Sequence, residues 1–272
     1  MRVRVEWRPV FPYFEQPVFA IGPFHIALFQ ILVCAAVIVG HELVVRRAAA
    51  RGWDREVASS LIAWTIFLGF IGSHVFDVVL YQPQLVRENP LELFKLWGSM
   101  SSFGGIIGGM LGGWWIARRK KLSGSQIFEF LDIVAFVFPF AWIFGRAGCA
   151  VAHDHVGIAT TSWLGVRFPD GTKFDLGLLE VLYTFAIVAV FLVLDRKPRP
   201  TGFFLGLFFV LYSPVRFLLD TLRTGDARYL GWTPGQYASV TGLLFGLGML
   251  AIALRQSRAG DAPAPVPAAR GR

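Results

Sequence analysis

The chain has 272 residues, of which 55% are hydrophobic and 16% are charged, and its formal net charge is +8. Soluble domains carry roughly 25% charged residues, so the composition excludes a soluble enzyme and indicates a chain that lies largely in hydrocarbon. It also excludes intrinsic disorder, and two cysteines exclude a disulfide framework.

Apolar runs recur along the chain, and most of them approach the ~20 residues that a helix needs to cross a bilayer. They lie at 22–44, 58–80, 103–117 (the shortest), 127–145, 176–194, 202–222 and 237–254. We therefore predict an all-α membrane protein with seven transmembrane helices. One transferase-like domain is predicted for 1–254, and the tail 255–272, which is basic and rich in Pro and Ala, is predicted to be disordered.

The lysines and arginines predict an orientation. More than half of them follow the first, third, fifth and seventh runs, at 46–55, 118–121, 196–199 and 255–272. Cytoplasmic loops carry such an excess, so the N-terminus is predicted outside and the C-terminus in the cytoplasm. The positive charge then faces lipid headgroups. A nucleic-acid partner is not expected, because the charges are scattered over short loops without a binding fold.

Two segments differ from a plain bundle of helices. The run 103–117 carries six glycines in two series with small-xxx-small spacing, which predicts close backbone packing against a neighbouring helix. The segment 146–175 is too polar to span a membrane. We expect it to form a small cap on the outer face.

Ionisable residues in or beside spanning helices are costly, so each is a candidate for function. They are His25, His74, Asp77, Glu129, Asp132, Arg146, Asp154, Glu180, Arg216, Asp220 and Arg223. Arg216 and Asp220 have i, i+4 spacing, and Tyr212 lies one turn earlier on the same face. This stripe is either an internal salt bridge or part of a site. His74 and Asp77 form either a general base or a pair that stabilises a helix end.

The segment Gly145-Arg146-Ala147-Gly148-Cys149 is the strongest local signal. We interpret its glycines as a sharp turn from which Arg146 projects, and a guanidinium at membrane depth suits a phosphate. His153, Asp154 and His155 follow. Three adjacent residues cannot all point one way on a helix, so no metal site is expected. Cys149 is either a nucleophile or a small packing residue.

The order of these features resembles the bacterial prolipoprotein diacylglyceryl transferases over residues 17–254. The motifs are Ile21-Gly22-Pro23, the stretch 98–108, Gly145-Arg146-x-Gly148 with Gly157 after it, Glu180, and Tyr212-x-x-x-Arg216. The resemblance implies a multi-pass protein of the bacterial plasma membrane. It also implies transfer of the diacylglyceryl group of phosphatidylglycerol, or a similar anionic phospholipid, to the lipobox cysteine of a preprolipoprotein, with release of glycerol phosphate.

Residue by residue, the resemblance makes Arg146 and Arg216 the essential arginines. It also implies that the lipid is bound by Gly104, Gly105, Asp154, Gly157, Glu180 and Tyr212, with no cofactor and no metal. Asp154 stands where the family has a glutamate. Further departures make this a divergent member: Phe103 replaces the family histidine, Cys149 an asparagine and Phe29 a tyrosine, while His74 and Asp77 stand for an arginine and a tyrosine.

The chemistry requires a thiolate, since a thiol of pKa ~8.5 attacks only after losing its proton, and it requires cations beside the leaving phosphate. We predict His74 as the base, oriented by Asp77. The alternatives are His153, His155, or no base at all if the arginines lower the thiol pKa.

Two other functions remain possible from the sequence. One is a paralogue that binds or translocates lipid and has lost catalysis. The other is an intramembrane aspartyl protease, with Asp220 facing either Asp132 or Asp77.

Overall fold

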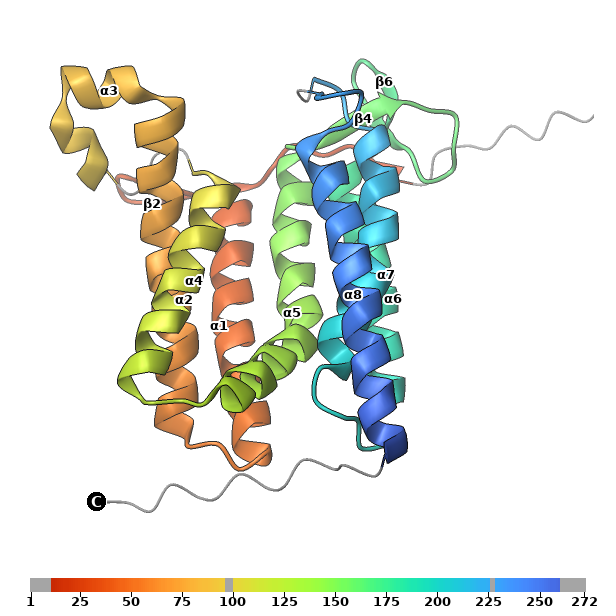
Figure 1. Ribbon diagram of the computed structural model, residues 1–272. Coiled ribbons are helices and arrows are strands. Elements are labelled where there is room, and N and C mark those ends of the chain that lie inside the picture. Colours follow the sequence, from red (N-terminus) through yellow and green to blue (C-terminus); the bar gives the residue numbers. More distant parts are fainter. Residues whose placement is uncertain (1–10, 96–99, 226–227, 260–272) are drawn as a thin grey trace, which may run out of the picture. The chain divides into compact units, whose positions relative to one another are not determined.

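The computed structural model describes residues 11–95, 100–225 and 228–259. The α-helices of these segments are α1 (Leu28–Ala50), α2 (Arg55–Phe76), α3 (Pro83–Glu88), α4 (Ser102–Arg119), α5 (Gly124–Ala152), α6 (Leu176–Leu194), α7 (Phe203–Thr221) and α8 (Pro234–Ala259). A π-helical segment η1 (Asp77–Tyr81) extends α2, and a 3-10 helix η2 (Pro90–Phe94) follows α3. Figure 1 shows these helices in the colours of the sequence.

The prediction of a helical protein with seven membrane-spanning helices is confirmed in part. Among the described residues, six helices are long and apolar enough to cross a membrane: α1, α2 continued by η1, α5, α6, α7 and α8. The run at 103–117 does form a helix, α4, which is not one of these six. The predicted tail begins inside α8, which continues to Ala259, and 260–272 lie outside the described residues.

The expectation of an all-α chain is wrong, because there are two small sheets. Strands β1 (Phe11–Pro12), β5 (Val166–Phe168), β6 (Gly171–Asp175) and β4 (Val156–Ala159) pair in that order. β1 runs parallel to β5, and the other neighbours are antiparallel. The predicted cap therefore contains three β-strands joined by loops, and its first residues, 146–152, still belong to α5.

A hairpin precedes α1. Its strands β2 (Val18–Ile21) and β3 (Phe24–Ala27) are antiparallel and meet at Gly22, whose φ of 59° falls in the left-handed region that glycine enters without strain. The first apolar run was predicted to become helical at residue 22, but α1 begins at Leu28. Hydropathy alone does not separate an apolar strand from an apolar helix.

The chain divides into two compact units. One holds the described residues 11–40 and 131–259, and so the hairpin, the four-stranded sheet, α6, α7, α8, most of α5 and the first part of α1. The other holds 41–130, with the end of α1, α2, α3, α4 and the start of α5.

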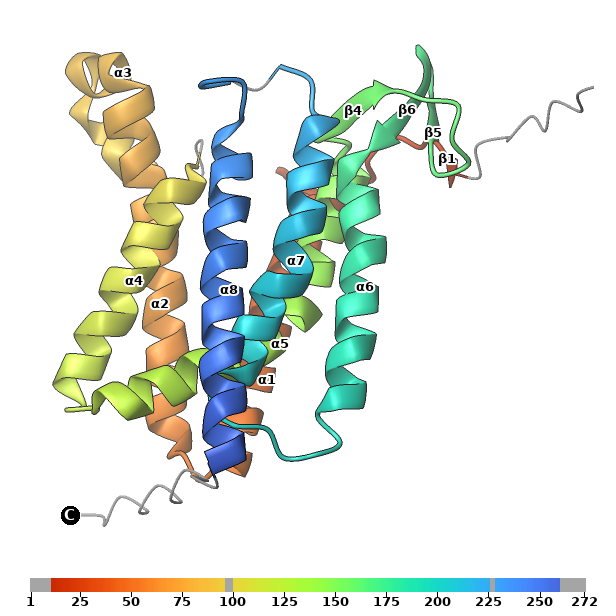
Figure 2. The same cartoon turned by 45° about the vertical axis from the view of Figure 1, so that its right-hand side comes forward.

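In the unit 41–130, α2 and α4 pack almost backbone to backbone, as both views show (Figures 1 and 2). A Cβ added at Gly104 would lie 2.3 Å from the carbonyl oxygen of Gly72, and one at Gly108 would lie 2.2 Å from that of Leu68. The predicted packing role of the glycine-rich helix is confirmed. At the start of α2, the side chain of Asp54 caps the helix by accepting from the Val57 amide at 2.9 Å.

In the other unit, Figure 2 shows α7 running beside α8. Phenylalanines fill the core of this unit. The ring of Phe136 lies edge-on to that of Phe204, with 4.8 Å between the ring centroids. Asp132, fully buried on α5, accepts from the Leu205 amide at 2.9 Å. That amide is in the first turn of α7, where backbone N–H groups have no acceptor within the helix. The Asp132 carboxylate supplies the acceptor, and its negative charge interacts favourably with the positive end of the helix dipole.

Candidate active site

A buried carboxylate gathers two arginines at the centre of the candidate site. Glu180 on α6 is 1% exposed. Its Oε2 lies 3.0 Å from Nε of Arg146 on α5 and 3.2 Å from Nη1 of Arg216 on α7. Its Oε1 accepts from the Tyr212 hydroxyl and, at 3.3 Å, from Nε1 of Trp142. Three helices thus bring together four of the residues that the sequence analysis singled out.

The Arg216 guanidinium has a second partner on its own helix. Its Nη2 lies 3.0 Å from Oδ1 of Asp220, so the internal salt bridge, one of the two alternatives that the i, i+4 spacing left open, is present. Asp220 is 1% exposed, and its other oxygen accepts from the Thr233 hydroxyl. A Cβ at Gly235 would come within 2.5 Å of this carboxylate, so the start of α8 holds Asp220 in place.

The cluster is electrically balanced: two guanidiniums face the two carboxylates Glu180 and Asp220. The Arg146 guanidinium also lies 4.7 Å from the ring centroid of Trp142, one turn earlier on α5, in a cation–π contact. Its Nη1 donates to Sγ of Cys149 at 3.6 Å. Balanced pairing lets the charges stay buried among apolar helices. Each planar guanidinium has further N–H groups besides those that face the carboxylates, and these suit an anion with several oxygens.

The predicted backbone turn at Gly145 and Gly148 is wrong. α5 continues through both glycines to Ala152. Glycine need not end a helix in an apolar environment, where internal hydrogen bonding is the only way to satisfy the backbone. Gly148 leaves room for a neighbour instead, since a Cβ there would lie 3.1 Å from the Phe29 ring.

The chain turns at His153, whose φ of 51° is left-handed. The following amide, of Asp154, donates to the Cys149 carbonyl at 3.4 Å, as in a Schellman ending. His153 is fixed by contacts on both ring nitrogens: Nδ1 lies 2.5 Å from Oδ2 of Asp175, and Nε2 lies 3.1 Å from the Phe14 carbonyl oxygen. His153 therefore joins the N-terminal segment to the first turn of α6.

Asp175 is the N-cap of α6 and accepts from the Leu178 amide at 3.0 Å. Burial raises the pKa of this carboxyl above its ordinary value, against the opposing effects of His153 and the Leu178 amide. The carboxylate oxygens thus serve a helix cap and a histidine at once.

Because of this turn, the side chains of Asp154 and His155 lie close to that of Cys149. Nδ1 of His155 pairs with Oδ1 of Asp154. The hydrogen bond with Asp154, followed by that with Cys149, raises the pKa of His155 to about 9, although burial acts to lower it. Burial acts to raise the pKa of Asp154, yet the hydrogen bond with His155 holds it below its ordinary value. A ligand atom from each of the three residues lies within 4.8 Å of the others.

Other predicted residues have structural surroundings of their own. Gly104 and Gly105 lie in the unit 41–130, where both face α2. Gly157 forms an isolated bridge with Arg223, and a Cβ there would lie 2.9 Å from the Leu222 carbonyl oxygen. His74, in the unit 41–130, is 1% exposed, and its Nε2 lies 3.0 Å from the Glu92 carbonyl oxygen.

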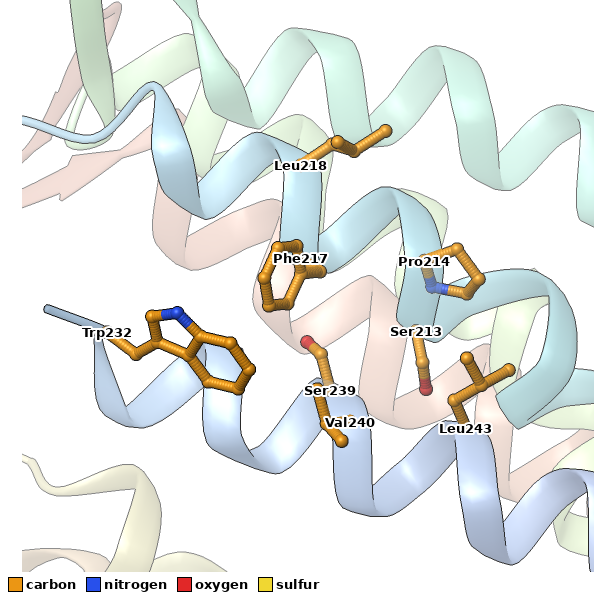
Figure 3. Close-up of a pocket in the computed structure, with 8 residues that line it drawn as sticks. All are labelled: Ser213, Pro214, Phe217, Leu218, Trp232, Ser239, Val240 and Leu243. Carbon is orange, nitrogen blue, oxygen red and sulfur yellow. The ribbon is translucent and has the colours of Figure 1, made fainter. Parts of the chain in front are cut away.

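An apolar groove lies between α7 and α8 (Figure 3). Its volume is about 370 Å³. Figure 3 shows the lining side chains: Ser213, Pro214, Phe217 and Leu218 from α7, and Trp232, Ser239, Val240 and Leu243 from the segment that leads into α8 and from α8 itself. Arg216 lies between Pro214 and Phe217 in the sequence of α7.

The sequence analysis missed three residues that hold the site. Trp142 on α5 donates to Glu180 on α6, and Thr233, just before α8, donates to Asp220 on α7. Asp175 holds the imidazole of His153. Trp142 precedes Arg146 by one helical turn, which is a spacing signal. Neither Thr233 nor Asp175 carries a signal of this kind, because its partner is distant in the sequence.

Comparison with known proteins gives consistent matches along almost the whole chain. Residues 16–252 match the family described as prolipoprotein diacylglyceryl transferase. A phosphatidylglycerol–prolipoprotein diacylglyceryl transferase of Pseudoalteromonas atlantica is 31% identical over 270 residues, which cover 94% of this chain and 95% of that protein. Proteins of the same name from Serratia proteamaculans and Pseudomonas aeruginosa PAO1 are 32% and 31% identical, and they cover 90% and 92% of this chain and 95% and 97% of their own.

Proposed function

Because the chain belongs to the prolipoprotein diacylglyceryl transferase family, we propose that it transfers the diacylglyceryl group of phosphatidylglycerol to the lipobox cysteine of a prolipoprotein. The observation that carries this proposal is the convergence of Arg146 and Arg216 on one buried carboxylate. In the reaction, the thiolate sulfur forms a bond to the glyceryl carbon, the bond from that carbon to the phosphate oxygen breaks, and glycerol phosphate leaves.

The arginines bind the phosphate and stabilise the negative charge that grows on it as it leaves. Glu180 and Asp220 orient the guanidiniums and balance their charge before lipid binds. Tyr212 supports the same carboxylate. Asp154 and Gly157 belong to the turn and the strand that follow α5, while Gly104 and Gly105 support the site indirectly by packing α4 against α2.

The acceptor thiol must also lose its proton before it attacks. His74 was predicted as the base, but its imidazole is buried and lies against the Glu92 carbonyl, so it meets a thiol only if that contact opens. The guanidiniums need no such opening to lower the pKa of a thiol beside them. We therefore favour the route without a general base, in which the thiol gives its proton to water before it attacks, and His74 stays a prediction to be tested.

The groove of Figure 3 supplies a place for one acyl chain of the donor. Two features support this occupant: the lining is almost wholly apolar, and the same helix carries Arg216, which binds the phosphate. A phospholipid whose headgroup lies at the arginines can extend a chain along α7 without leaving hydrocarbon.

We further propose that α4 is a seventh span, that the N-terminus and the β4–β6 sheet face outward, and that the protein lies in the bacterial inner membrane. The basic segments 46–55 and 118–121 then face the cytoplasm, which agrees with the excess expected there. Residues 1–254 act as one transferase domain in this proposal.

The direct test is rescue of cells depleted of their own transferase, combined with transfer to a lipobox peptide by the purified protein. We expect both to succeed. Arg146→Lys and Arg216→Lys each keep the charge but lose the planar fork, so kcat/KM falls about 10- to 100-fold. Arg228→Lys, in the exposed loop before α8, is the matched control and keeps full activity.

A specific observation favours one competing function. Phe103 stands where the family has a histidine, and its side chain is 54% exposed, so the chain could bind lipid without transferring it. Phosphatidylglycerol binding that is lost in Arg146→Ala, with no transfer ever detected from the parent protein, would establish the lipid-binding function instead.

A further inference from the structure

Cys149, Asp154 and His155 place three different ligand groups together beside the arginine cluster. A thiol sulfur, a carboxylate oxygen and an imidazole nitrogen lie within 4.8 Å of one another. This combination of sulfur, nitrogen and oxygen suits Zn²⁺, which binds such ligands at ~2.0 to 2.3 Å in a tetrahedron. The three ligand atoms have to draw closer to meet one ion at these distances.

The backbone brings these residues together and holds them there. Cys149 lies in the last turn of α5, and the left-handed residue His153 reverses the chain so that the Asp154 amide reaches the Cys149 carbonyl. His153 is itself fixed by Asp175 and by the Phe14 carbonyl. Both ring nitrogens of His153 therefore already have partners, and the third ligand group of the cluster, besides Asp154 and His155, is Cys149. The sequence-based expectation of no metal considered only 153–155, in which Cys149 has no part.

Charge and access also fit a divalent cation. Nearby Arg146 and Arg216 are balanced by Glu180 and Asp220. Binding of the ion would displace the protons of Cys149 and His155. A Cys149 thiolate and the Asp154 carboxylate, with the imidazole then neutral, carry two negative charges, which match one divalent ion. The Asp154 and His155 side chains are 39% and 24% exposed, so an ion can reach them without unfolding the turn.

We propose that Cys149, Asp154 and His155 form a binding site for one divalent cation of the Zn²⁺ class, with a fourth position open to water. Binding would move the Cys149 sulfur from Nη1 of Arg146 to the metal. The proposed cation site thus adjoins the proposed transfer site: it includes Asp154, which is also predicted to bind lipid, and it contacts Arg146 through Cys149.

The two cysteines permit a test inside one unaltered molecule. The purified full-length protein is treated with N-ethylmaleimide, with and without Zn²⁺, and the labelling of Cys149 and of the exposed Cys34 on α1 is followed by mass spectrometry. We expect Zn²⁺ at ten times its dissociation constant to slow the labelling of Cys149 about tenfold and to leave Cys34 unchanged. Equal rates at Cys149 with and without Zn²⁺ would overturn the site.

Substitutions then identify the ligands by a signal that does not depend on transfer. Co²⁺ should give a thiolate charge-transfer absorption in the parent protein and in the control variants Cys34→Ser and His25→Gln. Cys149→Ser should abolish the absorption, and Asp154→Asn and His155→Gln should weaken Co²⁺ binding. An absorption that survives Cys149→Ser, or that is lost in Cys34→Ser, contradicts the assignment.

Discussion

At the scale of single residues, Glu180 has the largest structural consequence for the site. Glu180 accepts hydrogen bonds from Trp142, Tyr212 and Arg216 and forms an ion pair with Arg146, while being 1% exposed. Removing its charge leaves two buried guanidiniums facing only Asp220. Burying an unbalanced charge costs far more than a single hydrogen bond contributes.

We therefore expect Glu180→Gln to lower the free energy of unfolding by about 3 to 5 kcal/mol, because one partner of a buried ion pair is removed while the volume is kept. Thermal unfolding in detergent measures this loss. Glu88→Gln, at the exposed end of α3, is the control and should unfold at the parent temperature. A Glu180→Gln protein as stable as the parent would show that the arginines do not depend on this carboxylate.

His74→Gln separates the two accounts of proton removal. Loss of a general base costs ~10²- to 10⁴-fold in rate, whereas the route without a base predicts a much smaller loss. We expect the smaller loss in initial rates of transfer to a lipobox peptide. His41→Gln, whose imidazole bonds to Ser59 in the same unit, is the matched control. A hundredfold fall in a normally folded His74→Gln protein would restore His74 as the base.

At the scale of elements, the two glycine series of α4 differ in how closely they approach α2. A Cβ at Gly104 would meet the Gly72 oxygen and the Phe76 Cβ, both at 2.3 Å, whereas the nearest atoms to a Cβ at Gly105 are 3.7 Å away. The same helix thus offers a tight and a roomy position side by side.

We expect Gly104→Ala to push α4 off α2 and lower the unfolding temperature clearly, and Gly105→Ala to leave it unchanged or slightly higher, since alanine favours a helix over glycine by ~1 kcal/mol. Thermal unfolding of the two variants, prepared in parallel, is the measurement. Equal stability of the pair would mean that the close approach of the helices is not needed.

The groove between α7 and α8 gives a second prediction at this scale. Leu243→Trp places a larger side chain in the groove, so we expect the KM for phosphatidylglycerol to rise with little change in kcat. Leu244→Trp, at the neighbouring position outside the groove lining and 65% exposed, is the control. If both variants bind donor equally well, the acyl chain lies elsewhere.

Hydropathy predicted where the helices lie, because the bilayer imposes length and composition on each span. It did not predict the β4–β6 sheet, whose short polar strands have no periodicity of their own, or the pairing of β1 with β5 far along the chain. For the site, spacing on one helix predicted the contact of Arg216 with Asp220. The convergence on Glu180 joins three helices and was not predicted; the sequence marked Glu180 only as an ionisable residue in an apolar run, and the family resemblance implied only that it binds lipid.

At the scale of the whole molecule, the proposed orientation predicts which loops face the outside of the membrane and which face the cytoplasm. In a background lacking both native cysteines, an impermeant thiol reagent should label Thr161→Cys, between β4 and β5, in intact cells. It should label Ser123→Cys, between α4 and α5, only after the membrane is opened. The reverse pattern would invert the proposed topology.

The parallel pairing of Phe11 with Val166 has a consequence for biosynthesis. A ribosome adds ~5–20 residues per second, so the partner of the first strand emerges about 8 to 30 seconds after that strand. During this interval β1 has no neighbour in its sheet, while the intervening helices are being inserted. The N-terminal strand therefore completes its sheet late, and a chain arrested before residue 166 would leave β1 open to chaperones and proteases.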